Sequence, residues 1–364
     1  MIFSLRREEL VEVLSDFNNI LKDNPIKPVI AGLKIQAIGD QVIFTGTNLE
    51  VNFIRTIGGE ILKEGVVVIK HLLVLEYVKL LENEIIHFSL DEDRLNIHHA
   101  EFSILDAEQY PDIKELSCEE IVKIQGKEFV SYLDKVKFSA AISNDNIGIN
   151  CIRIIFNSED GISFASTDSY RLTYLKTERN SLIQKEISIP LESVNIVCKL
   201  MKDLEDEVVI GLNGNTLIFK WNNIYFATKT IDLSFPNFKA ILESNSFSKE
   251  IEFNTKELKS ALKKVLTVAK TSIETRNGAL FEFKNKHLIM SAYSGRAKIN
   301  QKVDIIKIGE DFKCSLNARY LYEFIDNISE NTILKGNSSS AMFEISEFGN
   351  NSYKYVLMPL ALRD

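Results

Sequence analysis

Residues that build metal sites and disulfide frameworks are scarce in this sequence. Among 364 residues there are four cysteines, Cys118, Cys151, Cys198 and Cys314, and five histidines. The cysteines lie far apart and form no CxxC pair, which argues against a zinc ribbon and a disulfide scaffold. This cysteine usage fits a reducing compartment, so we expect a cytoplasmic protein.

Long apolar runs and an excess of positive charge are also missing. No segment approaches the roughly 20 apolar residues that a membrane-spanning helix needs, and the opening MIFSLRREEL lacks the apolar core of a secretion signal. We therefore expect no membrane partner. The net charge of −8 argues against tight DNA binding on an open face, because phosphate neutralisation needs a basic surface. A protein with this net charge can still carry local basic faces.

Motifs of common catalytic sites are absent as well. The sequence has no GxxxxGK[ST], no GxGxxG that opens a helix, no HExxH and no GxSxG. If the segment around His98 and His99 is a strand, these neighbours point to opposite faces and cannot hold one ion. Asp91 and Asp93 in DEDR favour a hairpin turn over an acid–base pair, and Asp168 has no His or Lys partner beside it. We expect no enzyme, no metal and no cofactor.

An internal repeat is the most informative feature that is present. Segments 3–17, 121–136 and 251–265 each combine a short alternating strand with an amphipathic helix. In each, a glutamate precedes apolar residues at i, i+4 and i+7, which lie on one helical face. The glutamates are Glu9, Glu128 and Glu257. A second helix is predicted about 60 residues later, with apolar anchors Val74/Tyr77/Leu81, Val197/Leu200/Leu204 and Leu321/Phe324/Ile328.

Three of only six prolines fall in register with this repeat. The pairs Tyr110-Pro111, Phe235-Pro236 and Met358-Pro359 stand 125 and 123 residues apart. We therefore predict an α+β protein of three repeated domains, each with two helices packed on antiparallel sheet. The predicted domains span residues 1–117, 118–245 and 246–364.

Lysines mark the polar face of the third repeat's first helix. Lys256, Lys259, Lys263 and Lys270 lie opposite the apolar positions, with Lys264 nearby. Such a face is usually a solvated helix surface. Its recurrence on other helices makes it a candidate binding track for a polyanion. The further lysines are Lys127, Lys135 and Lys137 in the second repeat and Lys70 and Lys79 in the first.

Four segments, in this order, resemble motifs of the bacterial DNA polymerase III beta subunit, the sliding-clamp family. They are FTGTNLE (44–50), FASTDSYRL (164–172), LSFPNFKAIL (233–242) and YVLMPLAL (355–362), and the resemblance covers the whole chain. It implies a head-to-tail homodimer of two three-domain subunits forming a ring around duplex DNA. Twelve helices at roughly 10 Å spacing would line a hole roughly 28 Å wide.

The resemblance implies a processivity factor that binds DNA without sequence preference and tethers the replicative polymerase. Implied partners are the DNA polymerase III catalytic subunit, the clamp loader and other proteins with QLxLF-type motifs. Two alternatives stay open at this point. One is a repeat-built enzyme with an active site between domains, and the other is a scaffold ring that does not bind DNA.

The family also implies site residues. The matching positions of its peptide-binding pocket are Cys151, Thr167, Ser169, Tyr170, Arg171, Leu172, Pro236, Ile241, Val356, Leu357, Met358, Pro359 and Leu360. The implied DNA-binding positions are Lys22, Asn24, Lys70, His71, Ile149 and Asn150. The implied dimer interface joins Phe102 and Ile104 of AEFSILD to Lys270, Thr271 and Ile273. One departure is Ser169-Tyr170, where the family motif carries Gly-His.

Overall fold

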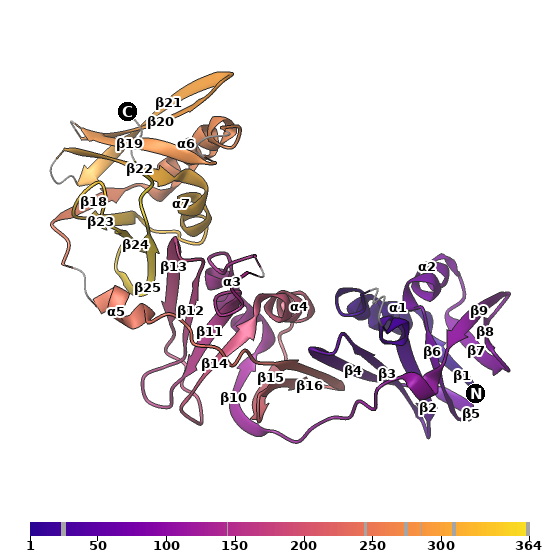
Figure 1. The fold of residues 1–364 in the computed structure, drawn as a ribbon. Helices are drawn as coiled ribbons and strands as arrows, with labels where there is room; N and C mark the ends of the chain where they lie inside the picture. Colours follow the sequence, from indigo (N-terminus) through magenta and orange to yellow (C-terminus); the bar gives the residue numbers. More distant parts are fainter. Residues whose placement is uncertain are drawn as a thin grey trace. The chain divides into compact units, whose positions relative to one another are not determined.

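The computed structural model describes residues 1–22, 27–143, 145–243, 246–272, 276–284, 286–307 and 311–361 (Figure 1). Two predicted site residues, Asn24 and Ile273, lie outside these ranges. The chain forms two compact units. One contains Met1–Val130 with Glu192–Thr230, and the other contains Ser131–Leu191 with Ile231–Asp364.

The first unit is built on thirteen antiparallel strands in the order β10-β15-β16-β17-β4-β3-β2-β6-β9-β8-β7-β1-β5. Buried residues alternate with more accessible ones in β2, whereas β16 and β17 are buried at consecutive positions. The strands are β1 (Ile2–Arg6), β2 (Leu33–Ile38), β3 (Gln41–Thr47), β4 (Val51–Gly58), β5 (Glu60–Lys63), β6 (Gly65–Ile69), β7 (Ile85–Asp91), β8 (Arg94–Ile97), β9 (Ala100–Leu105), β10 (Glu119–Gln125), β15 (Glu207–Asn213), β16 (Thr216–Trp221) and β17 (Ile224–Lys229).

Twelve antiparallel strands make up the second unit, in the order β14-β11-β12-β13-β25-β24-β23-β18-β21-β20-β19-β22. They are β11 (Cys151–Phe156), β12 (Ser163–Thr167), β13 (Arg171–Lys176), β14 (Lys185–Pro190), β18 (Lys249–Phe253), β19 (Gly278–Lys284), β20 (His287–Ser294), β21 (Ala297–Lys307), β22 (Phe312–Asn317), β23 (Thr332–Gly336), β24 (Phe343–Glu347) and β25 (Asn350–Leu357).

The strand orders reveal one pattern repeated three times. Each repeat has an outer group made of its first strand and its last three strands. These groups are β1-β7-β8-β9, β10-β15-β16-β17 and β18-β23-β24-β25. Each also has a middle group, namely β6-β2-β3-β4, β14-β11-β12-β13 and β22-β19-β20-β21. The central repeat gives its outer group to the first unit and its middle group to the second. The predicted α+β class, with helices on antiparallel sheet, is thereby confirmed.

Seven α-helices lie in the described residues: α1 (Arg7–Asp16), α2 (His71–Leu80), α3 (Gly126–Lys137), α4 (Leu191–Met201), α5 (Phe238–Glu243), α6 (Thr255–Ala269) and α7 (Ala318–Ile325). Three 3₁₀ turns span Phe17–Asn19, Pro28–Ala31 and Ala107–Gln109. The helix α1 packs beside α2, and α6 packs beside α7 (Figure 1). Two helices per repeat were predicted, and α5 is an addition.

The apolar anchors of the first helices are all buried, as their spacing predicts. In α6 these are Leu258, Leu262 and Val265, and the Asn254 side chain caps the helix by accepting a hydrogen bond from the Glu257 amide at 3.2 Å. The third anchors of the second helices were placed wrongly. Leu81, Leu204 and Ile328 lie beyond the helix ends.

The segment at His98 and His99 differs from the expected strand. β8 ends at Ile97, and His98 has φ 52° in the turn before β9. Two residues, Glu92 and Asp93, connect β7 to β8, so the predicted hairpin turn is confirmed.

Within the described ranges, no helix combines the length and apolarity needed to cross a membrane. The same residues include no group of three or more His, Cys, Asp or Glu side chains arranged to hold a metal ion.

Candidate functional site

An apolar cluster forms where the last strand of the chain meets the central repeat. β25 pairs with β13, which sets Val356 opposite Leu172. These two side chains are buried with Ala165 and Phe238, the first residue of α5. Partly buried apolar residues surround them: Ile155, Tyr174, Phe235, Ile241, Leu242 and Met342. Segments almost 200 residues apart in the sequence thus build one apolar centre.

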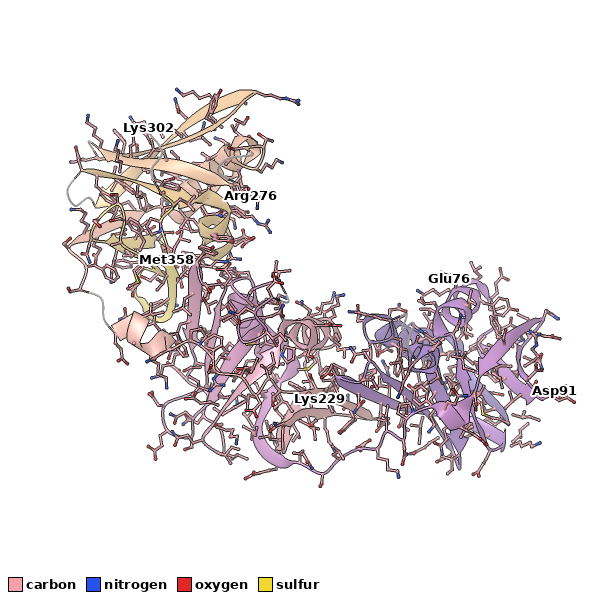
Figure 2. All side chains as sticks on the ribbon, in the orientation of Figure 1. Glu76, Asp91, Lys229, Arg276, Lys302 and Met358 are labelled. Carbon is pink, nitrogen blue, oxygen red and sulfur yellow. The ribbon has the colours of Figure 1, made fainter. Side chains whose placement is uncertain are left out.

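Two large side chains near the end of β25 are exposed to solvent. Met358 and Tyr170 are 43% and 64% exposed, and Met358 is labelled in Figure 2. The Met358 amide donates to the Tyr170 carbonyl at 2.9 Å, and the Leu360 amide donates to the Ser315 carbonyl at 2.7 Å. These bonds hold the segment after β25 in place. We call Tyr170, Pro236, Ile241, Met358 and Leu360 the C-terminal surface.

The turn between β12 and β13 carries Tyr170 and is shaped by its own side chains. Asp168 Oδ1 accepts hydrogen bonds from the amides of Tyr170 and Arg171 at 3.0 and 3.1 Å. Thr167 Oγ1 accepts from the Ser169 amide at 3.1 Å. Ser169 has φ 75°, a left-handed conformation that glycine adopts more readily. This backbone requirement explains why the family motif carries glycine at this position.

Arg171 lies beneath the turn and is only 6% exposed. Its Nε donates to Asp168 Oδ2 at 2.9 Å, its other nitrogens contact Glu323 and the Phe138 carbonyl, and its guanidinium stacks 3.9 Å from the Tyr320 ring centre. Burial alone would lower the pKa of Arg171, but Tyr355, Glu323 and Asp168 raise it above its usual value. A permanent buried cation therefore fixes the turn to α7.

The residues predicted for the peptide pocket lie at three depths. Cys151, Thr167, Arg171, Leu172, Val356 and Leu357 are buried. Ile241, Pro359 and Leu360 are half-buried, whereas Ser169, Tyr170, Pro236 and Met358 are exposed. The Cys151 thiol donates to the Gly148 carbonyl at 3.4 Å, and burial raises its pKa to about 11. The prediction omitted Phe238, although its position two residues after Phe235-Pro236 was a readable signal.

Two of the implied DNA-binding residues, His71 and Ile149, have buried side chains. His71 is 3% exposed, and its Nε2 lies 3.0 Å from Asn18 Oδ1. Burial lowers the pKa of His71 to about 4, so the ring is neutral at pH 7. Ile149 is 6% exposed. Neither side chain presents a contact surface to a phosphate.

The other implied DNA-binding residues in the described ranges reach the surface. Lys22 is exposed and pairs with Glu192 Oε1 at 2.5 Å. Lys70 is exposed at the start of α2. Asn150 is half-buried, and its Nδ2 donates to the Ile142 and Ser143 carbonyls at 3.2 and 3.3 Å. Asn150 thus holds the preceding loop.

Two joints connect the repeats by the same strand pairing. β17, the last strand of the second repeat, pairs antiparallel with β4 of the first. In the same way β25, the last strand of the third repeat, pairs with β13 of the second. In the first repeat, β9 occupies the position that β17 and β25 have in the other two. In the third repeat, β21 occupies the position that β4 and β13 have in the other two.

Both remaining strands have an open edge over most of their length. Residues 100–103 of β9 pair only with β8, and only Ile104 and Leu105 reach β6. Most of β21 pairs only with β20, because β18 contacts just Ile305 and Lys307. Phe102 and Ile104 are half-buried, and the Phe102 ring lies 5.6 Å from that of Tyr77. Lys270 and Thr271 are exposed at the end of α6.

A cavity beside the first joint has an open counterpart beside β21. The first cavity, about 360 Å³, is lined by α1, β4, the end of α4 and the β16–β17 turn. The second, about 430 Å³, is lined only by α6 and β21. When Glu9 is aligned with Glu257, Asp16 in the first repeat corresponds to Lys264 in the third. When the first residues of β4 and β21 are aligned, Arg55 corresponds to Gln301. The second cavity therefore lacks the walls that a following repeat supplies in the first.

Family models of the DNA polymerase III beta subunit match almost the entire chain. The N-terminal domain matches residues 1–114, the central domain residues 123–237 and the C-terminal domain residues 244–361. A beta sliding clamp from Vibrio cholerae is 23% identical over the full length of both chains. One from Staphylococcus aureus is 21% identical over 99% of each.

Solved structures share the fold. The DNA polymerase sliding clamp of Bacillus subtilis has a TM-score of 0.91 at 20% identity, with both chains fully covered. The Pseudomonas aeruginosa sliding clamp bound to griselimycin has a TM-score of 0.89 at 20% identity, again with full coverage of both chains. With three consecutive domain models matched, this chain belongs to the DNA polymerase III beta subunit family.

Proposed function

We propose that this chain is a DNA sliding clamp, a processivity factor that encircles duplex DNA and tethers a replicative polymerase. The observation that carries the proposal is the repeated strand joint. β4 receives β17 and β13 receives β25, while β21 and β9 keep their matching edges open. Pairing β9 of one copy with β21 of another would continue the same pattern. A twofold axis then closes two chains into a ring of six domains.

The first joint suggests a register for the joint between copies. There the first residue of β17, Ile224, pairs with the fifth residue of β4, Arg55. The same offset sets Ala100 opposite Gln301 and Phe102 opposite Ile299. The exposed Glu101 would then lie between Lys298 and Lys302, which are also exposed. Opposite charges on neighbouring strands favour this pairing. We place Phe102, Ile104, Lys270, Thr271 and Ile273 at this interface.

The C-terminal surface is the proposed docking site for partner peptides. One of its members, Ile241, packs on the buried centre of Leu172, Val356 and Phe238. The exposed Met358 and Tyr170 suit an anchor side chain of a QLxLF-type motif. Buried members of the implied pocket, such as Cys151 and Arg171, would support this surface from below. The proposed partners are the polymerase catalytic subunit, the clamp loader and other proteins with such motifs.

We further propose that the protein acts without catalysis or a cofactor in the cytoplasm, with domain boundaries near residues 117 and 245. The deciding experiment is retention of the purified protein on DNA circles. A closed ring remains on a nicked circle during gel filtration and slides off after the circle is cut once. Equal retention on both forms would indicate ordinary DNA binding, and retention on neither would contradict the proposal.

A further inference from the structure

The first helices of the three repeats carry different charges at equivalent positions. Glu9, Glu128 and Glu257 align α1, α3 and α6. The residues that directly precede these glutamates are Glu8, Lys127 and Lys256. Six residues after them stand Ser15, Asp134 and Lys263, and seven residues after them stand Asp16, Lys135 and Lys264. At these three positions the first repeat has two carboxylates and a serine, the second has two lysines and a carboxylate, and the third has three lysines.

The basic side chains of α6 form one continuous face. Lys256, Lys263 and Lys270 are exposed and seven residues apart, with the exposed Ser260 and Thr267 between them. At a rise of about 1.5 Å per residue, the lysines are spaced about 10 Å apart along the helix. We call Lys256 and Lys263 the α6 basic face, because Lys270, at the end of the helix, belongs to the proposed interface between copies.

Few acidic groups neutralise this face. Among the described residues, neither Lys256 nor Lys270 forms an ion pair, and Lys263 Nζ lies 5.8 Å from the Tyr322 ring centre. The adjacent Lys259 is different, because it is bound to Asp326. The α6 basic face therefore keeps its positive charge available for a ligand.

The corresponding region of the first repeat is rich in carboxylates, although Glu12 and Asp16 pair with Arg55. Glu8 and Glu12 are exposed on α1, and they line a cavity together with Glu82 and Glu84. Arg6 and Arg7 share this cavity, but the carboxylates outnumber them. On α2 the exposed residues include Leu72, Leu73 and Leu80 beside Glu76, which is labelled in Figure 2.

In the second repeat, neighbouring groups already engage the lysines. Lys127 pairs with Glu205 Oε1 at 2.7 Å, and Lys137 pairs with Asp134 Oδ1 at 2.5 Å. Lys135 Nζ lies 5.7 Å from the Tyr353 ring centre. The two ion pairs lower the positive potential that a phosphate would meet, whereas Lys135 has the same kind of ring contact as Lys263. The third repeat therefore offers the strongest attraction among the three first helices.

We infer that the α6 basic face is the principal phosphate-binding surface of this chain, and that the helices of the first repeat contribute little. The inference deepens the proposed clamp function and rests on it. Two copies related by a twofold axis would present two such faces to one duplex. The grip on DNA would then come from two opposed third repeats and would be uneven around the hole.

The test compares Lys256→Ala/Lys263→Ala with the parent protein on a short linear duplex. Each lost phosphate contact lowers the magnitude of the slope of log K against log salt by about 1. We expect a decrease of about 2 to 4, according to whether one or both faces contact the duplex, with affinity at low salt about tenfold weaker or more. The matched control is Lys63→Ala/Lys123→Ala, which removes two exposed lysines from strands β5 and β10 and should leave the slope unchanged.

A gain-of-binding variant provides a second test in the opposite direction. Glu8→Lys gives the first repeat the residue type that Lys256 provides in the third, and it should strengthen duplex binding and steepen the slope. Sedimentation must show the same oligomer for every variant. Equal slopes for parent, lysine double variant and control would overturn the inference, even if the parent remains on DNA circles. If the parent does not remain on circles, the ring proposal fails, while the slopes still decide which lysines bind phosphate.

Discussion

At the scale of single residues, burial determines which polar groups take part in binding. His71 follows Lys70 in a short run that resembles a cationic patch, yet its ring is buried and neutral. Ile149 and Cys151 flank Asn150 in the sequence, and both are buried. Sequence reasoning identified the positions from the family motif. It could not assign their depth, because depth depends on the strands and loops that pack over them.

The buried His71 predicts a specific pH dependence of stability. Its folded pKa of about 4 lies below the ordinary value of 6.5. The unfolded chain therefore binds a proton that the folded chain excludes, and stability falls as the pH drops from 6.5 toward 4. This histidine should account for about 1 to 3 kcal/mol of that loss.

Urea unfolding of His71→Gln at pH 7 and pH 4.5 measures this contribution. The variant should lose less stability between the two pH values than the parent, since glutamine does not titrate. His99→Gln, which changes an exposed histidine, is the control and should follow the parent. Equal losses in all three proteins would show that His71 is protonated without cost in the folded state.

At the scale of elements, periodicity predicted the helices well and the surfaces less well. The anchors of α1, α3 and α6 are buried as expected because helical spacing alone sets which side chains share a face. The short helix α5 was missed, since six residues after a proline leave too few turns to show a period. Its Phe238 nevertheless belongs to the buried apolar centre with Leu172 and Val356.

The C-terminal surface predicts where a partner peptide loses affinity. A QLxLF-type peptide should bind the parent at about micromolar affinity. Replacing Met358 and Tyr170 together by alanine removes two exposed contacts, each contributing about 1 to 3 kcal/mol at typical interface positions. We expect binding at least about tenfold weaker in calorimetric titration.

The control for this experiment is Leu182→Ala, another exposed apolar side chain of the same unit. The double variant should still assemble and remain on DNA circles. Unchanged peptide affinity in the double variant would place the docking site elsewhere.

At the scale of the whole molecule, the threefold repeat was readable from the sequence, but the strand joints were not. Prolines and helix anchors recur at fixed intervals, whereas β4 and β17 pair across more than 160 residues. No local pattern encodes such a partner. The sequence did single out AEFSILD as an interface segment, and the structure places it on β9, a strand with one edge largely open. Its proposed partner β21 was chosen by analogy with the other joints.

Assembly through β9 can be tested with charged substitutions. Phe102→Glu/Ile104→Glu places two carboxylates on a strand that is proposed to lie beside Ile299 and near α6. Sedimentation should show monomers at concentrations where the parent is a dimer. Leu62→Glu, at an exposed apolar position on β5, should remain dimeric. A dimer of the double variant, with unchanged dissociation constant, would remove β9 from the interface.

The strand joints also determine how such a ring responds to dilution. The two joints within a chain, β4 with β17 and β13 with β25, are connected by covalent segments. Their partners therefore meet at a fixed effective concentration, which is in the millimolar range for short connections. A joint between copies has only the concentration of free protein. The same pairing would thus stay closed inside each chain while the ring opens on dilution at its two intermolecular seams. The fraction of closed rings would depend on the number of copies in the cell.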